Sequence, residues 1–152
     1  MADVKKILIV EDEIPLLDSY AELVEAAGYV PLKASDGYQA LDILSNNLDQ
    51  IDLVLLDLMM PGVDGLEVLK TIKRNEDKYG KMPIAVLTNM TSESVVKEAF
   101  DLGAISYLVK TDLDYDGLVK ELSKLFGYNV NLLTALKWGK ILYHQRVSLL
   151  KF

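Results

Sequence analysis

The sequence has no cysteine among its 152 residues. Disulfide cross-links, thiolate metal sites and cysteine nucleophiles are therefore excluded. It also lacks any apolar stretch that approaches the roughly 20 residues needed to cross a bilayer. The first apolar run, Ile7 to Val10, spans only four residues and follows Asp3 and Lys5, so we expect no signal peptide. These absences predict a soluble, cytoplasmic protein that makes no membrane contact.

Acidic residues are missing from the end of the chain. All 23 Asp and Glu residues precede residue 127, together with 12 of the 16 Lys and Arg residues, so this part carries a formal charge of −11. Such a body would repel phosphates, which argues against a nucleic-acid partner. Residues 127–152 carry four basic side chains and no acid, a formal charge of +4. We therefore divide the chain into one domain, residues 1–126, and a basic tail, residues 127–152.

The tail has apolar residues at helical spacing. One side of a hypothetical helix carries Leu132, Leu136, Tyr143, Val147 and Leu150, and His144 lies on the opposite, polar side. Gly139 weakens this helix by about 1 kcal/mol relative to alanine. We expect one extra helix whose apolar arc docks on protein, either on its own domain or on a second copy in a homodimer.

Five short apolar runs alternate with amphipathic patterns up to residue 126. The predicted strands are Lys6–Val10, Val30–Ala34, Leu53–Leu56, Ile84–Leu87 and Tyr107–Val109. The predicted helices are Pro15–Ala27, Gly37–Asn46, Leu66–Asn75, Ser92–Leu102 and Asp116–Phe126. Three of the five runs are nearly unbroken aliphatic stretches, which are typical of a parallel sheet that is buried on both faces. The alternation predicts an α/β fold with a doubly wound, five-stranded parallel sheet.

Polar residues follow four of these strands. Glu11 and Asp12 follow the first strand, Asp57 the third, Thr88 the fourth and Lys110 the fifth. In an open α/β sheet, ligands bind beyond the carboxyl ends of the strands, so we expect these five side chains to converge on one edge. Any one of them alone could be an ordinary wet loop residue. Together they place carboxylates beside desolvated strand ends, where they need a cation.

Each member of this set has a distinct chemical capacity. The carboxylates of Glu11, Asp12 and Asp57 are hard oxygen ligands that suit Mg²⁺. An aspartate can also act as a nucleophile toward phosphorus. The Lys110 ammonium would neutralise the oxygens of a transferring phosphoryl group, and Thr88 offers a hydroxyl donor. No His or Cys nucleophile lies at this edge, which excludes an acyl-transfer triad there.

These residues resemble the receiver family of response regulators in two-component signalling. The resemblance covers residues 4 to about 126 and rests on the stretches Leu8–Glu13 and Leu56–Gly65, with Thr88 and Lys110 in register. It implies a flavodoxin-like strand order 2-1-3-4-5, the order for which a chemotaxis regulator of this family is a standard example. It also implies roles for individual residues: Asp57 is the phosphoacceptor, and Asp12 and Asp57 are direct metal ligands. Glu11 would act on the metal largely through water, and the Met59 backbone carbonyl would complete the protein's ligands. Thr88 and Tyr107 would form the switch.

Two residues depart from the family pattern. The family usually has proline after its lysine, in a cis peptide, whereas this chain has Thr111. A non-proline cis bond costs roughly 3–4 kcal/mol, so we expect a trans peptide after Lys110. The residue after Thr88 is usually small, and here it is Asn89. A larger side chain at this place would hinder access to the phosphorylated aspartate or position a water beside it.

The resemblance implies a single-domain response regulator. Its phosphoryl donor would be a sensor histidine kinase or a histidine phosphotransfer protein, and its output a contact with a downstream protein target. It would not be an enzyme, beyond Mg²⁺-dependent self-phosphorylation and autodephosphorylation. Two alternatives stay open at this point: a receiver fragment of a longer DNA-binding transcriptional regulator, and an aspartyl-phosphate phosphohydrolase.

Overall fold

A computed structural model of the chain describes residues 4–127. Five parallel strands form one sheet in the order β2-β1-β3-β4-β5, as the resemblance implied. The strands are β1 (Lys6–Val10), β2 (Val30–Ala34), β3 (Leu53–Leu56), β4 (Ile84–Thr88) and β5 (Ser106–Val109). The fold is the predicted doubly wound α/β sheet.

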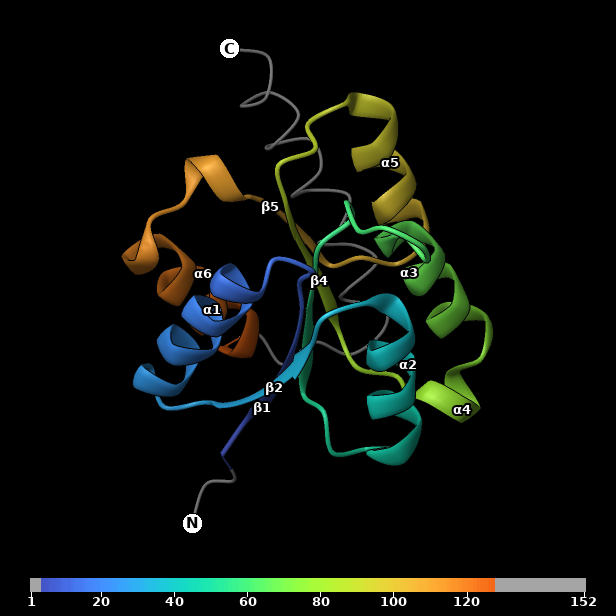
Figure 1. The fold of residues 1–152 in the computed structure, drawn as a ribbon, viewed down its shortest axis with the longest axis horizontal. Helices are drawn as coiled ribbons and strands as arrows, with labels where there is room; N and C mark the ends of the chain where they lie inside the picture. The colour runs from blue at the N-terminus through green and yellow to red at the C-terminus, as the bar shows by residue number, and fades with distance from the viewer. Residues whose placement is uncertain (1–3, 128–152) are drawn as a thin grey trace.

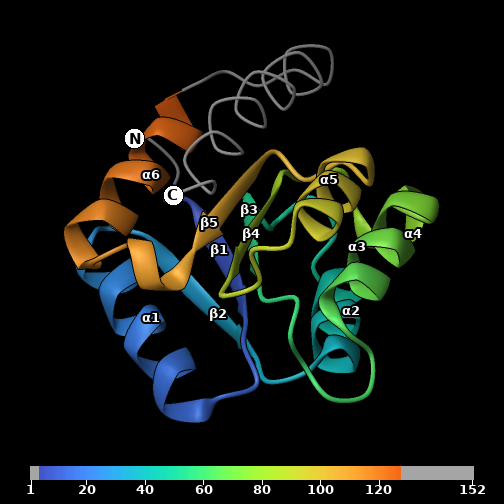
Figure 2. The ribbon, with the colours of Figure 1, turned by 90° about the horizontal axis from the view of Figure 1, so that it is seen from above.

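Helices cover both faces of this sheet (Figures 1 and 2). They are α1 (Ile14–Ala26), α2 (Gly37–Asn46), α3 (Gly65–Arg74), α4 (Glu76–Tyr79), α5 (Glu93–Asp101) and α6 (Tyr115–Gly127), with a 3₁₀ turn η1 (Lys110–Asp112). In both views α1 and α6 lie on one face, whereas α2, α3 and α5 lie on the other. The ends of the five strands and five helices predicted up to residue 126 fall within one residue of these bounds. Among residues 4–127, the short elements α4 and η1 are the ones that were not predicted from the sequence.

The core forms two hydrophobic clusters, one on each face of the sheet. Alternate residues of a strand point to opposite faces, so neighbouring residues of β1 belong to different clusters. Leu8, Val10, Val54, Leu56 and Val86 pack toward α2, α3 and α5. Ile7, Ile9, Leu53, Leu55 and Leu87 pack toward α1 and α6. Burial on both faces explains why these strands are almost wholly aliphatic.

Side chains and turns fix several helix ends. Asp36 begins α2 by accepting a hydrogen bond from the Gln39 N–H, and Asp64 does the same for α3 with the Glu67 N–H. Gly28, with φ +97°, follows α1 in the predicted capping position. Ser92 begins α5 as predicted, but its side chain makes no cap hydrogen bond.

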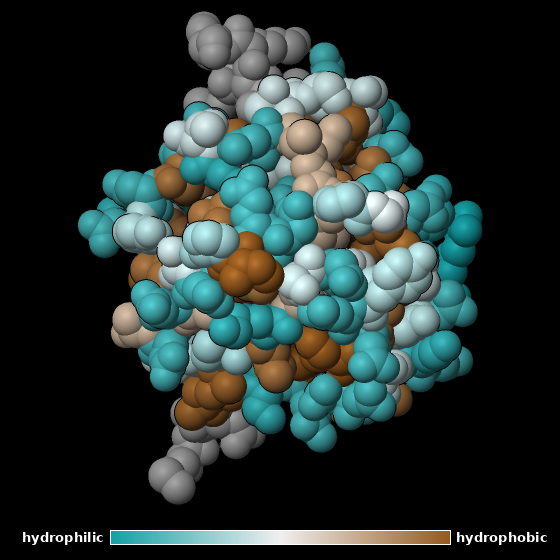
Figure 3. All heavy atoms as spheres, viewed as in Figure 1, coloured by the Kyte–Doolittle hydropathy of each residue, from teal (hydrophilic) through white to brown (hydrophobic). Residues whose placement is uncertain are grey.

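The predicted tail helix and its docking lie outside the described residues. Of the predicted tail, residues 127–152, the structure describes Gly127 alone, which ends α6. Among residues 4–127, no helix is long and apolar enough to cross a membrane. The face shown in Figure 3 is largely hydrophilic, with apolar residues scattered among polar ones. This distribution fits a domain whose apolar residues are mostly used in the two clusters under the helices.

Candidate functional site

The sheet brings the predicted site residues to one edge. Val10 pairs with Leu56 in the register of β1 and β3, so Glu11 and Asp57 follow at the same level. Thr88 pairs with Val109 in the register of β4 and β5, so Lys110 follows directly after that pair. The Asp57 N–H also donates to the Val10 carbonyl at 3.0 Å, which continues the ladder past β3. Parallel register therefore accounts for the convergence.

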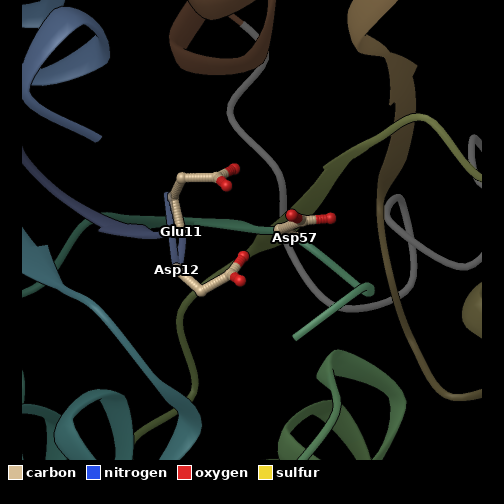
Figure 4. Close-up of side chains that lie close together, drawn as sticks. All are labelled: Glu11, Asp12 and Asp57. Atoms are coloured by element: carbon tan, nitrogen blue, oxygen red, sulfur yellow. The ribbon is translucent and has the colours of Figure 1, made fainter. Parts of the chain in front are cut away.

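Three carboxylates cluster at this edge (Figure 4). One carboxylate oxygen from each of Glu11, Asp12 and Asp57 lies within 4.8 Å of the others. Glu11 is 2% exposed and Asp57 4% exposed, whereas Asp12 is half-buried. Like charges this close repel one another, and burial adds a desolvation cost, so the cluster needs positive charge. Its spacing and its hard oxygen donors fit Mg²⁺.

Lys110 supplies part of that charge. Its Nζ donates to Glu11 Oε2 at 2.5 Å and to Asp57 Oδ2 at 3.0 Å. Burial alone would lower the pKa of Lys110, but the two carboxylates outweigh it and raise the pKa above its usual value. Burial raises the pKa of Glu11, and the nearby charge of Asp57 adds to this, although Lys110 opposes both effects. Lys110 is thus held protonated between two acidic groups.

The two oxygens of Asp57 have different partners. Oδ2 accepts from Lys110, and Oδ1 accepts from the backbone N–H of Met59 at 3.1 Å. This backbone bond shapes the loop after β3 and fixes the orientation of the carboxylate. The Met59 side chain points into solvent, with 59% of its surface exposed. Metal ligation by the Met59 carbonyl stays a prediction.

Thr88 and Tyr107 meet at the backbone of Met90. The Met90 N–H donates to Thr88 Oγ1 at 3.4 Å, and the Tyr107 hydroxyl donates to the Met90 carbonyl at 2.7 Å. Thr88 is fully buried and Tyr107 is 1% exposed, so the ring points inward in this structure. Burial raises the pKa of Tyr107, and the charge of Asp57 adds to the shift. The switching roles of both residues stay predictions.

The two residues that depart from the family pattern, Asn89 and Thr111, are joined by a hydrogen bond. The peptide after Lys110 is trans, as expected, since there is no cis bond among residues 4–127. Because residue 111 is threonine and not proline, it has a backbone N–H, which donates to Asn89 Oδ1 at 3.1 Å. From the sequence alone, Asn89 and Thr111 were interpreted as two unrelated departures. The adjacency of β4 and β5 in the predicted strand order was the signal that could have joined them.

Comparisons with known proteins agree with this geometry. Residues 7–123 match the family described as response regulator receiver domain. The transcriptional regulatory protein CpxR of Escherichia coli K12 is 40% identical over 105 residues, which cover 69% of this chain and 42% of CpxR. Sporulation initiation phosphotransferase F of Bacillus subtilis is 34% identical over 111 residues, which cover 72% of this chain and 86% of that protein.

Solved structures of the same fold extend the comparison. The chemotaxis protein CheY4 of Vibrio cholerae superimposes with a TM-score of 0.72 at 30% identity, covering 80% of this chain and 98% of that chain. CheY in a complex described as CheX-CheY-BeF3-Mg from Borrelia burgdorferi gives 0.73 at 25% identity, covering 80% and 89%. The chain spans less than half the length of CpxR but most of these shorter proteins. The family match and the site geometry together show that this chain belongs to the response regulator receiver family.

Proposed function

We propose that this receiver accepts a phosphoryl group on Asp57 from a sensor histidine kinase or a histidine phosphotransfer protein, and signals through contacts with a downstream protein. The observation that carries this proposal is the environment of Asp57. Its carboxylate lies at the end of a buried strand, paired with the Lys110 ammonium and clustered with two further carboxylates. An aspartate beside a fixed cation and a metal-binding cluster is suited to attack phosphorus.

Glu11, Asp12 and Asp57 would hold the divalent cation that this chemistry uses. Their oxygen atoms are close enough to share one ion, and Asp12 keeps the cluster open to solvent because it is only half-buried. A bound Mg²⁺ would supply positive charge to the phosphoryl oxygens during transfer. The CheY complex from Borrelia burgdorferi, whose description includes Mg and BeF3, supports this assignment.

The chain's own groups account for the transfer itself. A carboxylate oxygen of Asp57 forms a bond to phosphorus as the bond between phosphorus and the donor nitrogen breaks, and the donor imidazole leaves. Lys110, held at 3.0 Å from Asp57, stabilises the charge on the phosphoryl oxygens. The Thr88 hydroxyl then donates a hydrogen bond to a phosphoryl oxygen. This movement of Thr88 would shift the loop after β4, because the Met90 N–H donates to Thr88 Oγ1. Tyr107 would respond through its hydrogen bond to the same Met90 carbonyl.

The protein's catalysis would be limited to its own Asp57. Water would cleave the acyl phosphate at this site, with the same cation and lysine stabilising the charge. A phosphohydrolase would act on other substrates and would need a second carboxylate as a general acid and base, with an insertion that caps the substrate. Glu11 is engaged by Lys110 and would be a metal-site residue, so it does not supply that acid. We therefore favour signalling over phosphohydrolysis, in the cytoplasm where kinases of this class act.

A second candidate keeps the same site but adds an output domain. CpxR is described as a transcriptional regulatory protein, and this chain matches only 42% of it. That relation supports a receiver that belongs to a longer DNA-binding regulator. Sporulation initiation phosphotransferase F, matched over 86% of its length, supports the stand-alone receiver instead. We favour the stand-alone receiver, and the full length of the cellular product, read by intact mass, separates the two.

The phosphoacceptor is tested with acetyl phosphate and Mg²⁺. We expect the protein to gain one phosphoryl group by intact mass, and Asp57→Asn to gain none. Asp77→Asn is the matched control, because Asp77 is an exposed aspartate of the short helix α4. A phosphoryl adduct of equal yield on Asp57→Asn would contradict the assignment, and so would an adduct that forms equally in excess EDTA.

A further inference from the structure

Asn89 and Thr111 connect the two loops that carry the switch threonine and the lysine. Asn89 follows Thr88 at the end of β4, and Thr111 follows Lys110 at the end of β5. The hydrogen bond from the Thr111 N–H to Asn89 Oδ1 spans 3.1 Å and joins residues 22 positions apart. We propose that Asn89 is a positioning residue that holds Lys110 against Asp57 through Thr111. This proposal rests on the proposed phosphorylation of Asp57.

The hydrogen bond satisfies a donor that the local backbone leaves without an acceptor. Thr111 is the second residue of the 3₁₀ turn η1, and the first N–H groups of any helical turn have no acceptor inside it. The turn's own backbone bond, from the Leu113 N–H to the Lys110 carbonyl, is long at 3.4 Å. A side chain from the neighbouring loop thus adds a hydrogen bond that helps to fix this turn.

Fixing the turn constrains the lysine that begins it. The Lys110 Nζ bonds Glu11 and Asp57 at the same time, so the backbone of Lys110 must be held where the four-carbon stem can reach both carboxylates. Val109 anchors the backbone on one side, by its pairing with Thr88 in the sheet. Asn89 anchors the other side, at Thr111. Losing that anchor would let the ammonium sample positions away from Asp57.

Asn89 could instead act by its bulk alone, as an exposed side chain next to Thr88 that limits access to Asp57. Two substitutions separate these effects. Asn89→Ala removes both the acceptor and the bulk, whereas Asn89→Leu removes the acceptor and keeps a side chain of similar size. Positioning predicts the same change in both variants. Control by bulk predicts a change, toward faster reaction, in Asn89→Ala alone.

The first measurement is amide hydrogen exchange at Thr111, followed by NMR. We expect exchange to quicken by about three- to tenfold in Asn89→Ala and Asn89→Leu, the shift that corresponds to the net contribution of one hydrogen bond. Asn89→Asp keeps an Oδ acceptor and should restore protection. Thr91→Ala, an exposed residue of the same loop, is the matched control and should leave the exchange unchanged.

The second measurement is the rate of phosphorylation by acetyl phosphate at saturating Mg²⁺. We expect Asn89→Ala and Asn89→Leu to slow it by roughly three- to tenfold, since Lys110 spends less time on Asp57. Mg²⁺ affinity should not change, because Asn89 is not among the clustered carboxylates. In a Lys110→Ala background, adding Asn89→Leu should cause no further loss, because both changes act through the same ammonium.

The outcomes distinguish this proposal from the proposed function. A wild-type protein that gains no phosphoryl group would overturn the proposed function. The positioning role would then be tested by the NMR signals of the Lys110 side chain in Asn89→Leu. A shift of these signals would support the positioning role, and unchanged signals would overturn it. A phosphorylated wild type whose rate equals that of Asn89→Leu would overturn the positioning role alone. Faster phosphorylation confined to Asn89→Ala, or an equal further loss in the Lys110→Ala background, would also overturn it.

Discussion

At the scale of single residues, the site depends on one lysine shared by two acids. Glu11 and Asp57 are both almost fully buried, and Lys110 donates to each of them. An uncompensated buried charge is costly, so the ammonium allows the acidic cluster to exist before any cation binds. The cluster remains acidic overall, with three carboxylates to one lysine, which leaves it attractive to a divalent cation.

Replacing Lys110 with methionine tests whether the ammonium compensates the buried carboxylates. Two buried carboxylates would lose their cation, so we expect Lys110→Met to lower the free energy of unfolding by about 3 kcal/mol without Mg²⁺. Mg²⁺ should bind the variant at least as tightly as the wild type, because the competing ammonium is gone, and should restore part of the stability. Urea denaturation and calorimetric titration measure the two effects. Weaker Mg²⁺ binding by the variant would mean that Lys110 supports the cluster instead of competing for it.

The raised pKa of Tyr107 predicts that the stability of the folded protein depends on pH in the alkaline range. Its pKa is raised in the folded protein, first by burial and then by Asp57, while in the unfolded chain a tyrosine ionises near pH 10. Above about pH 10 the unfolded chain therefore releases a proton that the folded protein keeps, so stability falls as pH rises. Tyr107→Phe should remove this part of the slope. At neutral pH it should cost about 1 kcal/mol, for the lost bond to Met90.

The control for this prediction is Tyr38→Phe, because Tyr38 is 70% exposed. We expect urea denaturation to show that the free energies of unfolding of wild type and Tyr107→Phe differ less above pH 10 than at pH 8. The difference between wild type and Tyr38→Phe should not narrow in this way. A constant gap across this range would mean that Tyr107 ionises in the folded protein as it does in the unfolded chain.

The sequence predicted which residues meet at the site, but not how their side chains pair. Strand order and register bring Glu11, Asp57, Thr88 and Lys110 together, and both follow from backbone patterns. The pairing of Lys110 with Glu11 and of Asn89 with Thr111 depends on rotamers and on how far each side chain reaches. Periodicity carries no information on either. For the same reason the inward position of Tyr107 could be read only from the structure.

At the scale of elements, prediction worked where hydrophobic patterns were long enough. Unbroken aliphatic runs identified the buried strands, and helical spacing identified the five longer helices. The helix α4 has four residues and η1 has three, which is too short for a periodic pattern to appear. The turn η1 also takes the place where the family usually has proline, so the resemblance did not indicate it.

The start of α3 is packed against the loop that carries Asp57. A Cβ on Gly65 would lie 2.2 Å from the Asp57 carbonyl oxygen and 2.6 Å from Leu58 Cα, and both neighbours are backbone atoms. We expect Gly65→Ala to push the helix from this loop and to lower the free energy of unfolding by about 1–3 kcal/mol, the usual cost of overpacking. It should also weaken Mg²⁺ binding, because the Asp57 backbone must shift.

Gly127→Ala is the control for this prediction, since a Cβ there meets nothing within 4 Å at the end of α6. Urea denaturation and Mg²⁺ titration of the two variants make the comparison. Unchanged stability in Gly65→Ala would show that α3 can move away from the loop at little cost. The close approach of α3 would then not be what positions Asp57.

At the scale of the whole molecule, the acidic site links strands that are distant in sequence. Its carboxylates follow β1 and β3, and Lys110 follows β5. Unfolding the sheet separates all of them, so the cluster exists only in the folded domain. A cation that binds the cluster must therefore stabilise the entire domain, by an amount set by its concentration relative to its dissociation constant.

The linkage between Mg²⁺ binding and folding predicts how stability depends on Mg²⁺ concentration. Raising Mg²⁺ to 100 times its dissociation constant should add about 2.7 kcal/mol to the free energy of unfolding, and the melting temperature should rise with each further addition. Asp12→Asn should shift the whole curve to higher Mg²⁺, because it removes the most solvent-accessible of the three clustered carboxylates. NaCl at matched ionic strength controls for screening of the net charge of −7. If wild type and Asp12→Asn gain equal stability at every Mg²⁺ concentration, the ion does not bind at this cluster. If NaCl reproduces the gain, screening alone accounts for it.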